Sequence, residues 1–476
     1  MKSDTLPIPR TDAKKNLPEG WVWKKVSDLG EVLTGTTPTK AKKEYYDSKD
    51  YPFFKPTDLN EGYYVKKSGD GLSKKGIEEA RLLPSKSILV TCIGATIGKT
   101  GLIRVSGAFN QQINAIIPQK NVLPEFVYFV CISPQFQKSI IDNASATTLP
   151  ILNKRKFEML TMPIPPLIEQ QKIVSEIEKQ FSRLDEAVAA LKRVRASLKR
   201  YKASVLKDAV EGKLTEEWRK QNTNVEPADK LLKRILAERK KKWEEANSKK
   251  KYKEPAAPDT SSLPDLPKGW VWINFVRLAS DMKNSIKRGP FGSAIKKAFF
   301  VQKGYKVYEQ QNAIYNNHKL GNYYINEEKY NELIDFTVKP CDFIISCSGT
   351  IGKIAQIPES AEKGIINQAL LKITIDNKLV LSKYFLYLFK SDVFQKMFLK
   401  DIRGTAMKNI ASVEDLKLIP VALPPLHEQT TIVEEIESRL SVAEEIEETI
   451  DINLKRTERL RQAILKKAFS GKLITQ

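Results

Sequence analysis

The residues whose spacing comes nearest to a reactive motif are two glycine–lysine stretches, one in each half of the chain. Residues 93–100 read Ile-Gly-Ala-Thr-Ile-Gly-Lys-Thr, and residues 349–354 read Gly-Thr-Ile-Gly-Lys-Ile. A phosphate loop needs four residues between its first glycine and the Gly-Lys-Ser/Thr, so that successive amides wrap a phosphate. The first stretch has three residues there and the second has two, which disfavours nucleotide binding. We expect a tight turn instead, between strands at 87–92 and 101–105.

The rest of the chain contains no catalytic or metal-binding motif in a supporting context, such as HExxH, GxSxG or GxGxxG. The four cysteines form no Cys-x-x-Cys pair and only two histidines are present, which disfavours a zinc site. His427 is expected to be structural and His318 to lie in a loop. We therefore predict a non-catalytic chain that holds no metal and no cofactor.

The charge of the chain indicates a polyanionic partner. Its 476 residues carry 79 lysines and arginines against 57 acidic residues, a formal net charge of +22. The simplest such partner is nucleic acid; the alternative is that the basic composition only aids solubility. The polar residues 1–15 do not fit a signal peptide, and apolar runs such as 126–132 are too short for a membrane span. With so few cysteines, we expect a cytoplasmic protein without a membrane partner.

Sequence-specific reading of a DNA duplex needs planar or bidentate polar side chains on loops that enter a groove. Two polar or glycine-rich zones recur at an offset of 254: residues 35–43 with 289–297, and residues 55–58 with 309–312. An ordinary surface turn is the alternative for each residue. The candidate base contacts are Thr36, Thr37, Lys40 and Lys55 in the first half, and Lys287, Arg288, Gln310, Gln311 and Asn312 in the second.

Two further pairs of residues recur beside these zones. Lys99 and Lys353 close the two glycine–lysine turns and are candidates for contacts with DNA phosphates. The Asn-Gln pairs at 110–111 and 367–368 are expected to fall in apolar strands and to be structural.

The elements that must position these residues are given by an internal repeat. Leu-Pro-x-Gly-Trp-Val-Trp occurs at 17–23 and 266–272, and Pro-Pro-Leu-x-Glu-Gln at 165–170 and 424–429. Gly-Lys-Leu occurs at 212–214 and 471–473. The offset drifts from 249 to 259 before the Pro-Pro motif and then stays at 259. Loops tolerate insertions, whereas one inserted residue rotates a helical stripe by about 100°. Each half is therefore predicted to be a variable globular domain followed by a helix of fixed length.

Both predicted helices carry a coiled-coil seam with polar breaks. Ile177, Leu184, Leu191, Leu198 and Val205 recur every seven residues in the first, and Val433, Leu440 and Leu454 share a seam in the second. About 43 residues at 1.5 Å each give a length of roughly 65 Å. Each helix begins acidic and ends basic, so antiparallel pairing sets acid against base at both ends. Two separately solvated helices are the alternative.

Antiparallel helices would hold the two domains at opposite ends, related by an approximate two-fold axis within one chain. Duplex DNA also has an approximate two-fold axis, and paired readers contact separated half-sites on it. The domains differ in sequence, so the half-sites should differ, and the helices would fix the unread spacer.

Residues 215–262 have no counterpart in the second half. A basic helix is predicted over 228–246, followed by a lysine-rich run (Lys249, Lys250, Lys251, Lys253) and a proline-containing linker. This segment is either an arm that docks another subunit or a solvated connector.

The motifs at 17–23, 349–353, 165–170 and 212–214 resemble the specificity subunits of type I restriction–modification systems. No single motif is specific, but their duplicated order is, and the resemblance runs from about residue 17 to the C-terminus. It implies two target-recognition domains, two spacer helices and a bipartite, asymmetric DNA target. It also implies two adenine methyltransferase subunits on the spacer helices, with motor-endonuclease subunits for cleavage. S-adenosylmethionine, ATP and magnesium would belong to those partners.

The sequence thus predicts an α+β protein in which two long antiparallel coiled-coil helices separate two target-recognition domains. The expected bounds are 1–163 for the first domain, 164–212 for its helix, 213–265 for the arm and linker, 266–421 for the second domain, and 422–476 for its helix. The predicted function is sequence-specific duplex recognition that directs methyltransferase and endonuclease subunits. One rival is a basic scaffold that reads no sequence. The other is an enzyme that uses the turn at Gly98 and Lys99 on nucleotides.

Overall fold

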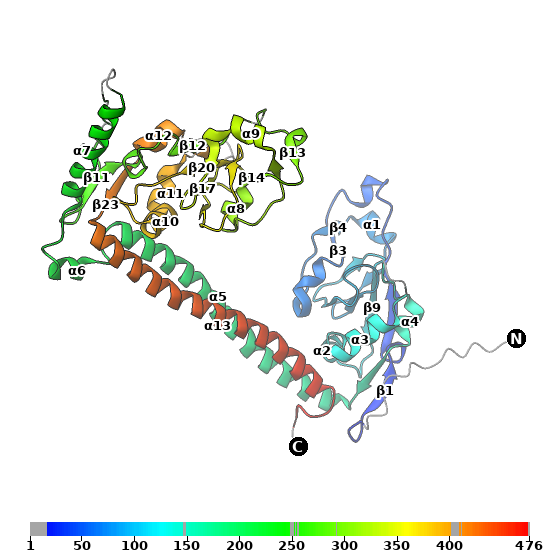
Figure 1. Cartoon of the computed structure of the whole chain (residues 1–476). Coiled ribbons are helices and arrows are strands. Elements are labelled where there is room, and N and C mark those ends of the chain that lie inside the picture. Colours follow the sequence, from blue (N-terminus) through cyan, green and yellow to red (C-terminus); the bar gives the residue numbers. More distant parts are fainter. Residues whose placement is uncertain are drawn as a thin grey trace. The chain divides into compact units, whose positions relative to one another are not determined.

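The computed structural model describes residues 17–145, 149–247, 252, 254, 257–291, 293–400, 409–410 and 412–474. The chain divides into two compact units, one of residues 1–193 with 450–476 and one of residues 194–449. Each unit contains one globular domain of mixed helix and strand, together with a stretch of both long helices (Figure 1). No helix within the described ranges is both long and apolar enough to cross a membrane.

The first domain is built on two four-stranded sheets. One is antiparallel in the order β2-β9-β6-β7; the other is mixed, in the order β4-β3-β8-β5, with β3 and β8 parallel. A further antiparallel pair joins β1 to β10. The elements are β1 (Val22–Lys25), β2 (Gly30–Thr34), β3 (Tyr51–Phe54), β4 (Asp70–Leu72), α1 (Lys74–Glu78), β5 (Leu82–Leu83), β6 (Ile88–Thr91), β7 (Thr100–Leu102), β8 (Gly107–Phe109), β9 (Ile113–Pro118), α2 (Pro124–Cys131), α3 (Pro134–Asn143), α4 (Lys154–Glu158) and β10 (Thr161–Ile164).

The second domain repeats this topology with one further strand, β13, at the edge of its mixed sheet. Its antiparallel sheet has the order β12-β20-β17-β18, its mixed sheet has the order β13-β15-β14-β19-β16 with β14 and β19 parallel, and β11 pairs with β23. The elements are β11 (Val271–Asn274), β12 (Ile286–Arg288), β13 (Phe300–Val301), β14 (Tyr305–Tyr308), α8 (Gln310–Ile314), β15 (Tyr324–Ile325), α9 (Glu327–Glu332), β16 (Thr337–Val338), β17 (Phe343–Ser346), β18 (Ile354–Gln356), β19 (Gly364–Ile366), β20 (Leu370–Ile373), α10 (Ser382–Lys390), α11 (Asp392–Phe398), β21 (Leu399–Lys400), β22 (Asn409–Ile410), α12 (Val413–Leu418) and β23 (Pro420–Leu423).

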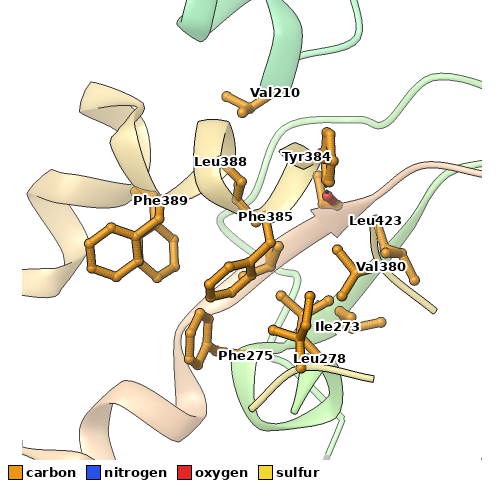
Figure 2. Close-up of a cluster of buried hydrophobic side chains, with 14 of the residues drawn as sticks. Val210, Ile273, Phe275, Leu278, Val380, Tyr384, Phe385, Leu388, Phe389 and Leu423 are labelled. Carbon is orange, nitrogen blue, oxygen red and sulfur yellow. Dashed lines mark hydrogen bonds between the residues drawn. The ribbon is translucent and has the colours of Figure 1, made fainter. Parts of the chain in front are cut away.

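The inner strands of each antiparallel sheet, such as β6, β17 and β20, are buried on both faces. In β17, Phe343 and Ile345 belong to the core beneath the helices, whereas Ile344 belongs to a second cluster with Tyr308 of the mixed sheet. Successive residues of a strand point to opposite faces of the sheet. The apolar residues of this one strand therefore pack alternately into two cores. Figure 2 shows the core beneath the helices, where the ring centroids of Phe385 in α10 and Phe275 lie 5.9 Å apart. Val210, at the end of the first long helix, belongs to the same core.

The helical region of each core is divided in two. In the first domain it is divided into α2 and α3 at Pro134. In the second domain it is divided into α10 and α11. The break falls at Ser391, whose hydroxyl accepts the backbone N–H of Phe394 at 3.2 Å, just as Ser133 caps α3. In the second domain a serine N-cap, without a proline after it, marks the start of the second helix.

The two long helices are α5 (Leu167–Val210) and α13 (Leu426–Ala468). In the first unit the beginning of α5 packs with the end of α13, where the Asp185 carboxylate pairs with Arg461. In the second unit the end of α5 packs with the beginning of α13, and Lys202 Nζ lies 2.7 Å from a Glu447 oxygen. The helices are therefore antiparallel, as the charge pattern predicted.

The repeated sequence motifs join each domain to a helix. Trp21 Nε1 donates to Glu169 at 2.9 Å in the first unit, and Trp270 Nε1 donates to Glu428 at 2.9 Å in the second. The following glutamine accepts the backbone N–H at the start of a core helix, since Gln429 Oε1 lies 2.8 Å from the Leu381 nitrogen. The Trp motif and the Glu-Gln motif thus form one attachment between a domain and a long helix, which we call the joint.

The Gly-Lys-Leu motif completes the same joint. Gly212 and Gly471 have φ values of 73° and 69°, a left-handed conformation that favours glycine. A Cβ at Gly212 would stand 2.6 Å from Pro267 Cγ, and one at Gly471 would stand 2.1 Å from Pro18 Cγ. The end of each helix therefore packs against the Leu-Pro motif that opens a domain in the same unit.

The unduplicated segment forms α6 (Glu216–Gln221) and α7 (Ala228–Ala246), so the predicted helix over 228–246 is confirmed. The apolar face of α7 packs on the second domain through Ala228, Leu231, Leu232 and Ile235. Arg239 pairs with Asp376 at 2.6 Å on the same domain. The lysine-rich run at 249–253 that the sequence singles out lies outside the described residues, apart from Tyr252.

Candidate nucleic-acid interface

In the first domain, four loops that the sequence separates meet at one face. The loop after β2 contacts the turn between β8 and β9, because Thr36 N donates to Phe109 O at 3.0 Å and Thr37 Oγ1 to Gln111 Oε1. A cleft of about 260 Å³ lies next to them. It is lined by Lys55, Pro56 and Thr57 after β3, by residues 93–96 of the β6–β7 turn, and by Gln112. The structure therefore brings both zones predicted for the first domain together. We call this set of loops the first face.

The candidate side chains of the first face differ in their exposure and in the contacts that they already make within the protein. Thr37 and Lys40 are exposed, whereas the Thr36 hydroxyl accepts the backbone N–H of Arg81 at 3.2 Å. Lys55 pairs with Asp70, and this ammonium group is the main cause that lowers the pKa of the Asp70 carboxyl. A phosphate approaching Lys55 would compete with that carboxylate.

In the second domain the corresponding loops line a cleft of about 1780 Å³. Lys287 and Arg288 of β12 border it, opposite Gly349 of the β17–β18 turn and Gln368 of the β19–β20 turn. Lys287 Nζ lies 5.1 Å from the centre of the Phe336 ring, and Arg288 is exposed. We call the loops around this cleft the second face. Its border carries two cations on adjacent residues.

The zone at residues 309–312 is helical, which corrects the prediction of a turn. Glu309 caps α8, whose first residues are Gln310, Gln311 and Asn312. The sequence lacked a serine or threonine cap, and here Glu309 and Asn312 form the reciprocal capping pair.

The three predicted residues of this zone have different surroundings. Asn312 is fully buried and donates to the carbonyls of Asn317 and Leu320 at 2.9 and 2.8 Å, so its amide holds the following loop. Gln311 Nε2 donates to Glu309 at 2.8 Å. Gln310 points toward the second face, since its Nε2 lies 3.8 Å from where a Cβ at Gly349 would stand. Its Oε1 is buried and has no hydrogen-bond partner within the described residues.

The two glycine–lysine stretches are turns between strands, as predicted. Strand β6 passes through residues 92–99 into β7, and β17 passes through residues 347–353 into β18, so no helix follows either lysine. A Gln side chain docks on each turn: Gln137 Nε2 donates to Gly98 O at 2.8 Å, and Gln395 Nε2 to Gly352 O at 3.4 Å. Both turns are therefore fixed against a core helix.

The lysines of these turns remain accessible to different degrees. Lys99 Nζ donates to Asn60 Oδ1 at 2.9 Å, whereas Lys353 is exposed. An exposed ammonium on a fixed turn can bind a phosphate as a point charge.

The Asn-Gln pairs lie in turns, which corrects the prediction of apolar strands. Asn110 and Gln111 lie between β8 and β9, and Asn367 and Gln368 lie between β19 and β20. The asparagines are structural, as expected: Asn367 Oδ1, for example, accepts the Ala369 N–H at 3.0 Å. Gln111 and Gln368 are exposed at the two faces, and sequence reasoning missed them as candidate contacts. Their duplication between two predicted strands was the available signal.

The chemistry of both faces is that of binding. Among the described residues, no group of three or more His, Cys, Asp or Glu side chains could hold a metal ion. Amides such as Gln310 and Gln368 can make paired hydrogen bonds to the edge of a base, and the guanidinium of Arg288 can do so with guanine. Lysines can contact phosphates. The two faces therefore suit a nucleic-acid duplex.

Comparison with known proteins supports this interpretation. The family profile described as "Type I restriction modification DNA specificity domain" matches residues 18–199 and 286–456. The specificity subunit of the type I restriction enzyme HindI from Haemophilus influenzae is 36% identical over 173 residues, which cover 35% of this chain and 37% of that protein. The EcoKI specificity subunit from Escherichia coli is 23% identical over 476 residues, covering 97% of this chain and 90% of that protein.

Two solved structures share the fold. A chain from a structure of a type I R-M system covers 96% of this chain and 100% of its own length, with a TM-score of 0.63 and 18% identity. The HsdS subunit from Thermoanaerobacter tengcongensis covers 97% of this chain and 99% of its own length, with a TM-score of 0.52 and 16% identity. At these identities the likeness concerns the fold alone.

Proposed function

Because the chain belongs to the family of type I restriction modification DNA specificity domains, we propose that it reads an asymmetric, bipartite duplex target for a restriction–modification complex. The first domain, within residues 1–163, reads one half-site, and the second, within residues 266–421, reads the other. The helices of residues 164–212 and 422–476 set the spacer between them.

The observation that carries this proposal is the duplication of the face with divergent side chains. Both domains present loops from equivalent strands of equivalent sheets. The frame is the same in both, but Lys55 stands where the second domain has Glu309, and Thr37 stands where it has Phe291, both at an offset of 254. Residues that differ on a common frame are suited to read different bases, which is the chemistry of two unlike half-sites.

We propose the following division of contacts. Thr36, Thr37, Lys40 and Lys55 contact the first half-site, and Lys287, Arg288, Gln310 and Gln311 contact the second, with Lys99 and Lys353 on phosphates. Gln111 and Gln368 join them as exposed amides at the faces. Asn312 supports the second face through the loop that its amide holds.

In the same proposal the chain supplies no catalytic group. Two adenine methyltransferase subunits would bind the spacer helices, and restriction and motor subunits would join them for ATP-dependent cleavage. The setting would be the cytoplasm. The rival function is a basic scaffold that joins subunits without reading sequence, which the net charge of +22 would also suit.

A selection from a randomised duplex library tests the proposal. The chain is purified with its natural partners, and binding is selected at about physiological salt, because backbone contacts alone dominate at low salt. Two short, different half-sites at a fixed spacing are expected. Recovery of duplexes without a shared motif would instead establish the scaffold.

A domain exchange then tests independent reading. Replacing residues 266–421 with the second domain of a relative should change one half-site and leave the other and the spacer as they were. The chain without the exchange, selected in parallel, is the matched control. A change in both half-sites would show that the two domains do not read separately.

A further inference from the structure

The second face carries a conspicuously exposed aromatic side chain. Phe291 is 92% exposed, and the next most exposed large apolar residues that the structure describes, Ile168 and Tyr315, are both at 70%. Burying a phenylalanine side chain is among the larger contributions that one residue makes to the stability of a fold. The fold gains almost none of this from Phe291, so packing gives no reason for a phenylalanine at this position.

The backbone on both sides of Phe291 is held in place. The loop leaves β12 through Gly289, whose N–H donates to Leu370 O at 2.9 Å. On the other side, Ala294 N donates to the carbonyl of Phe291 itself at 2.9 Å. Phe291 therefore stands between two backbone hydrogen bonds, at the border of the 1780 Å³ cleft.

The residues around the ring favour a binding partner that is a polyanion and also carries an apolar group. Phe291 follows Arg288 by three residues, and both border the cleft together with Lys287 and the exposed amide of Gln368. A protein partner of ordinary composition would match the ring but not the cations. A DNA duplex matches both, because its phosphates pair with cations and thymine carries a 5-methyl group in the major groove.

The first domain has a different residue at this place. At the offset of 254 that relates the two loops, Phe291 corresponds to Thr37, whose hydroxyl donates to Gln111. The first face thus has a polar contact where the second has an apolar one. Such a difference on a shared frame is expected of a position that distinguishes two half-sites.

We propose that Phe291 is a specificity-determining residue of the second half-site and packs against the 5-methyl group of a thymine in the major groove. This rests on the function proposed above. Arg288 and Gln368 flank the ring with groups that hydrogen-bond base edges, which is why the major groove is favoured over a wedge in the minor groove.

The test uses the complete complex and the duplex that the selection yields. Each thymine of the second half-site is replaced in turn by uracil, which removes only the methyl group. For the unaltered protein, one such replacement should weaken binding roughly fourfold, the effect expected for one buried carbon. In Phe291→Ser, which leaves no methyl group or ring to meet the thymine, binding should weaken about tenfold and the same uracil should then have no further effect.

Two control variants isolate the contact. Trp23→Ala removes an exposed aromatic ring from β1 of the first domain and should leave the uracil response of the second half-site unchanged. Phe291→Leu keeps an apolar contact and should retain most of the uracil response. Thermal unfolding of both Phe291 variants should match the unaltered protein, because the Phe291 side chain is 92% exposed.

The outcomes separate this inference from the proposed function. If the selection gives no motif, the proposed function fails and the inference with it. If two half-sites appear but Phe291→Ser binds and responds to uracil like the unaltered protein, only the inference is overturned. A rise in 2-aminopurine fluorescence that depends on Phe291, without any uracil effect, would identify a base-step wedge and overturn the methyl contact.

Discussion

The indole Nε1 of Trp270 lies 2.9 Å from a carboxylate oxygen of Glu428, a residue 158 positions later in the chain. The other oxygen of Glu428 accepts the Thr215 hydroxyl at 2.6 Å and Arg219 Nη1 at 2.5 Å. One buried carboxylate thus ties the second domain, the beginning of α13 and the segment after α5. In the first unit, Glu169 occupies the equivalent place and is partly exposed; among the described residues its carboxylate accepts a hydrogen bond only from Trp21.

The two joints are therefore expected to differ in strength. Glu428→Ala should destabilise the second unit by about 3–5 kcal/mol, since it leaves Arg219 and two further donors without their acceptor. Glu169→Ala should cost the first unit only about 1 kcal/mol, the worth of one ordinary hydrogen bond. Native-state hydrogen exchange of β11 and β23, and of β1 and β10, measures each unit separately, which one unfolding midpoint cannot do.

Glu428→Gln is the matched control for this joint, because it keeps the shape and removes the charge. Glu428→Gln should destabilise the second unit, but by less than Glu428→Ala does. Equal losses from Glu428→Ala and Glu169→Ala would show that the additional donors contribute nothing.

The register of the long helices can be tested through one cross-helix pair. Lys202 and Glu447 lie 2.7 Å apart with about a third of each side chain exposed, so their coupling should be about 0.5 kcal/mol. Lys202→Glu should destabilise the second unit by setting two carboxylates together, and adding Glu447→Lys should restore most of that loss. Hydrogen exchange of the second unit in the four members of the cycle measures the coupling; additive effects would contradict the pairing.

The cysteines should differ sharply in reactivity. Burial raises the pKa of Cys92 and of Cys347 to about 12 and also raises the pKa of Cys131, whereas Cys341 is exposed. Thiolate is the reactive form, so at pH 8 a thiol of pKa 12 is ionised in roughly one molecule in ten thousand. A disulfide reagent should therefore label one thiol quickly in the native protein.

The control variant for this labelling is Cys341→Ser, which should abolish the fast phase, while denaturant should expose the remaining thiols. Raising the pH from 8 to 9 should increase the thiolate fraction at the buried sites about tenfold without a fast phase, because burial also blocks access. Fast labelling of two or more thiols in the native state would contradict this assignment of burial.

The long helices could be predicted because they leave periodic and repeated signals in the sequence. The constant offset of 259 between the Pro-Pro and Gly-Lys-Leu motifs indicated two helices of the same length. Their opposed charges indicated that the helices pair antiparallel. The helix at 228–246 and the break at Pro134 follow from amphipathic spacing and from a residue that cannot continue a helix. The break at Ser391 has no proline, and a serine cap inside an apolar run is a weaker signal.

The faces could be predicted only in part, because they depend on strand order. Thr37 and Gln111 are 74 residues apart and meet because β2 pairs with β9. No local pattern reveals that pairing. Gln310 was proposed as a base contact, although it was expected on a loop and not in a helix. Phe291, a lone apolar residue in a polar zone, was not proposed at all. Its exposure, which is what makes it informative, is a property of the folded loop.

The last prediction concerns the spacer of the proposed target. Inserting four residues after Ala189 in α5, with a matched insertion near Arg459 in α13, lengthens both helices by about 6 Å and keeps the stripe within about 40° of its direction. If the helices set the spacer, the preferred distance between the half-sites should grow by about two base pairs of roughly 3.4 Å each. Both half-sites should stay the same, since neither face is altered. The library selection measures this directly, with a same-length substitution of residues 186–189 as its control. If the insertion left the spacer unchanged, the helices would not set the distance between the half-sites, although each domain could still read its own half-site.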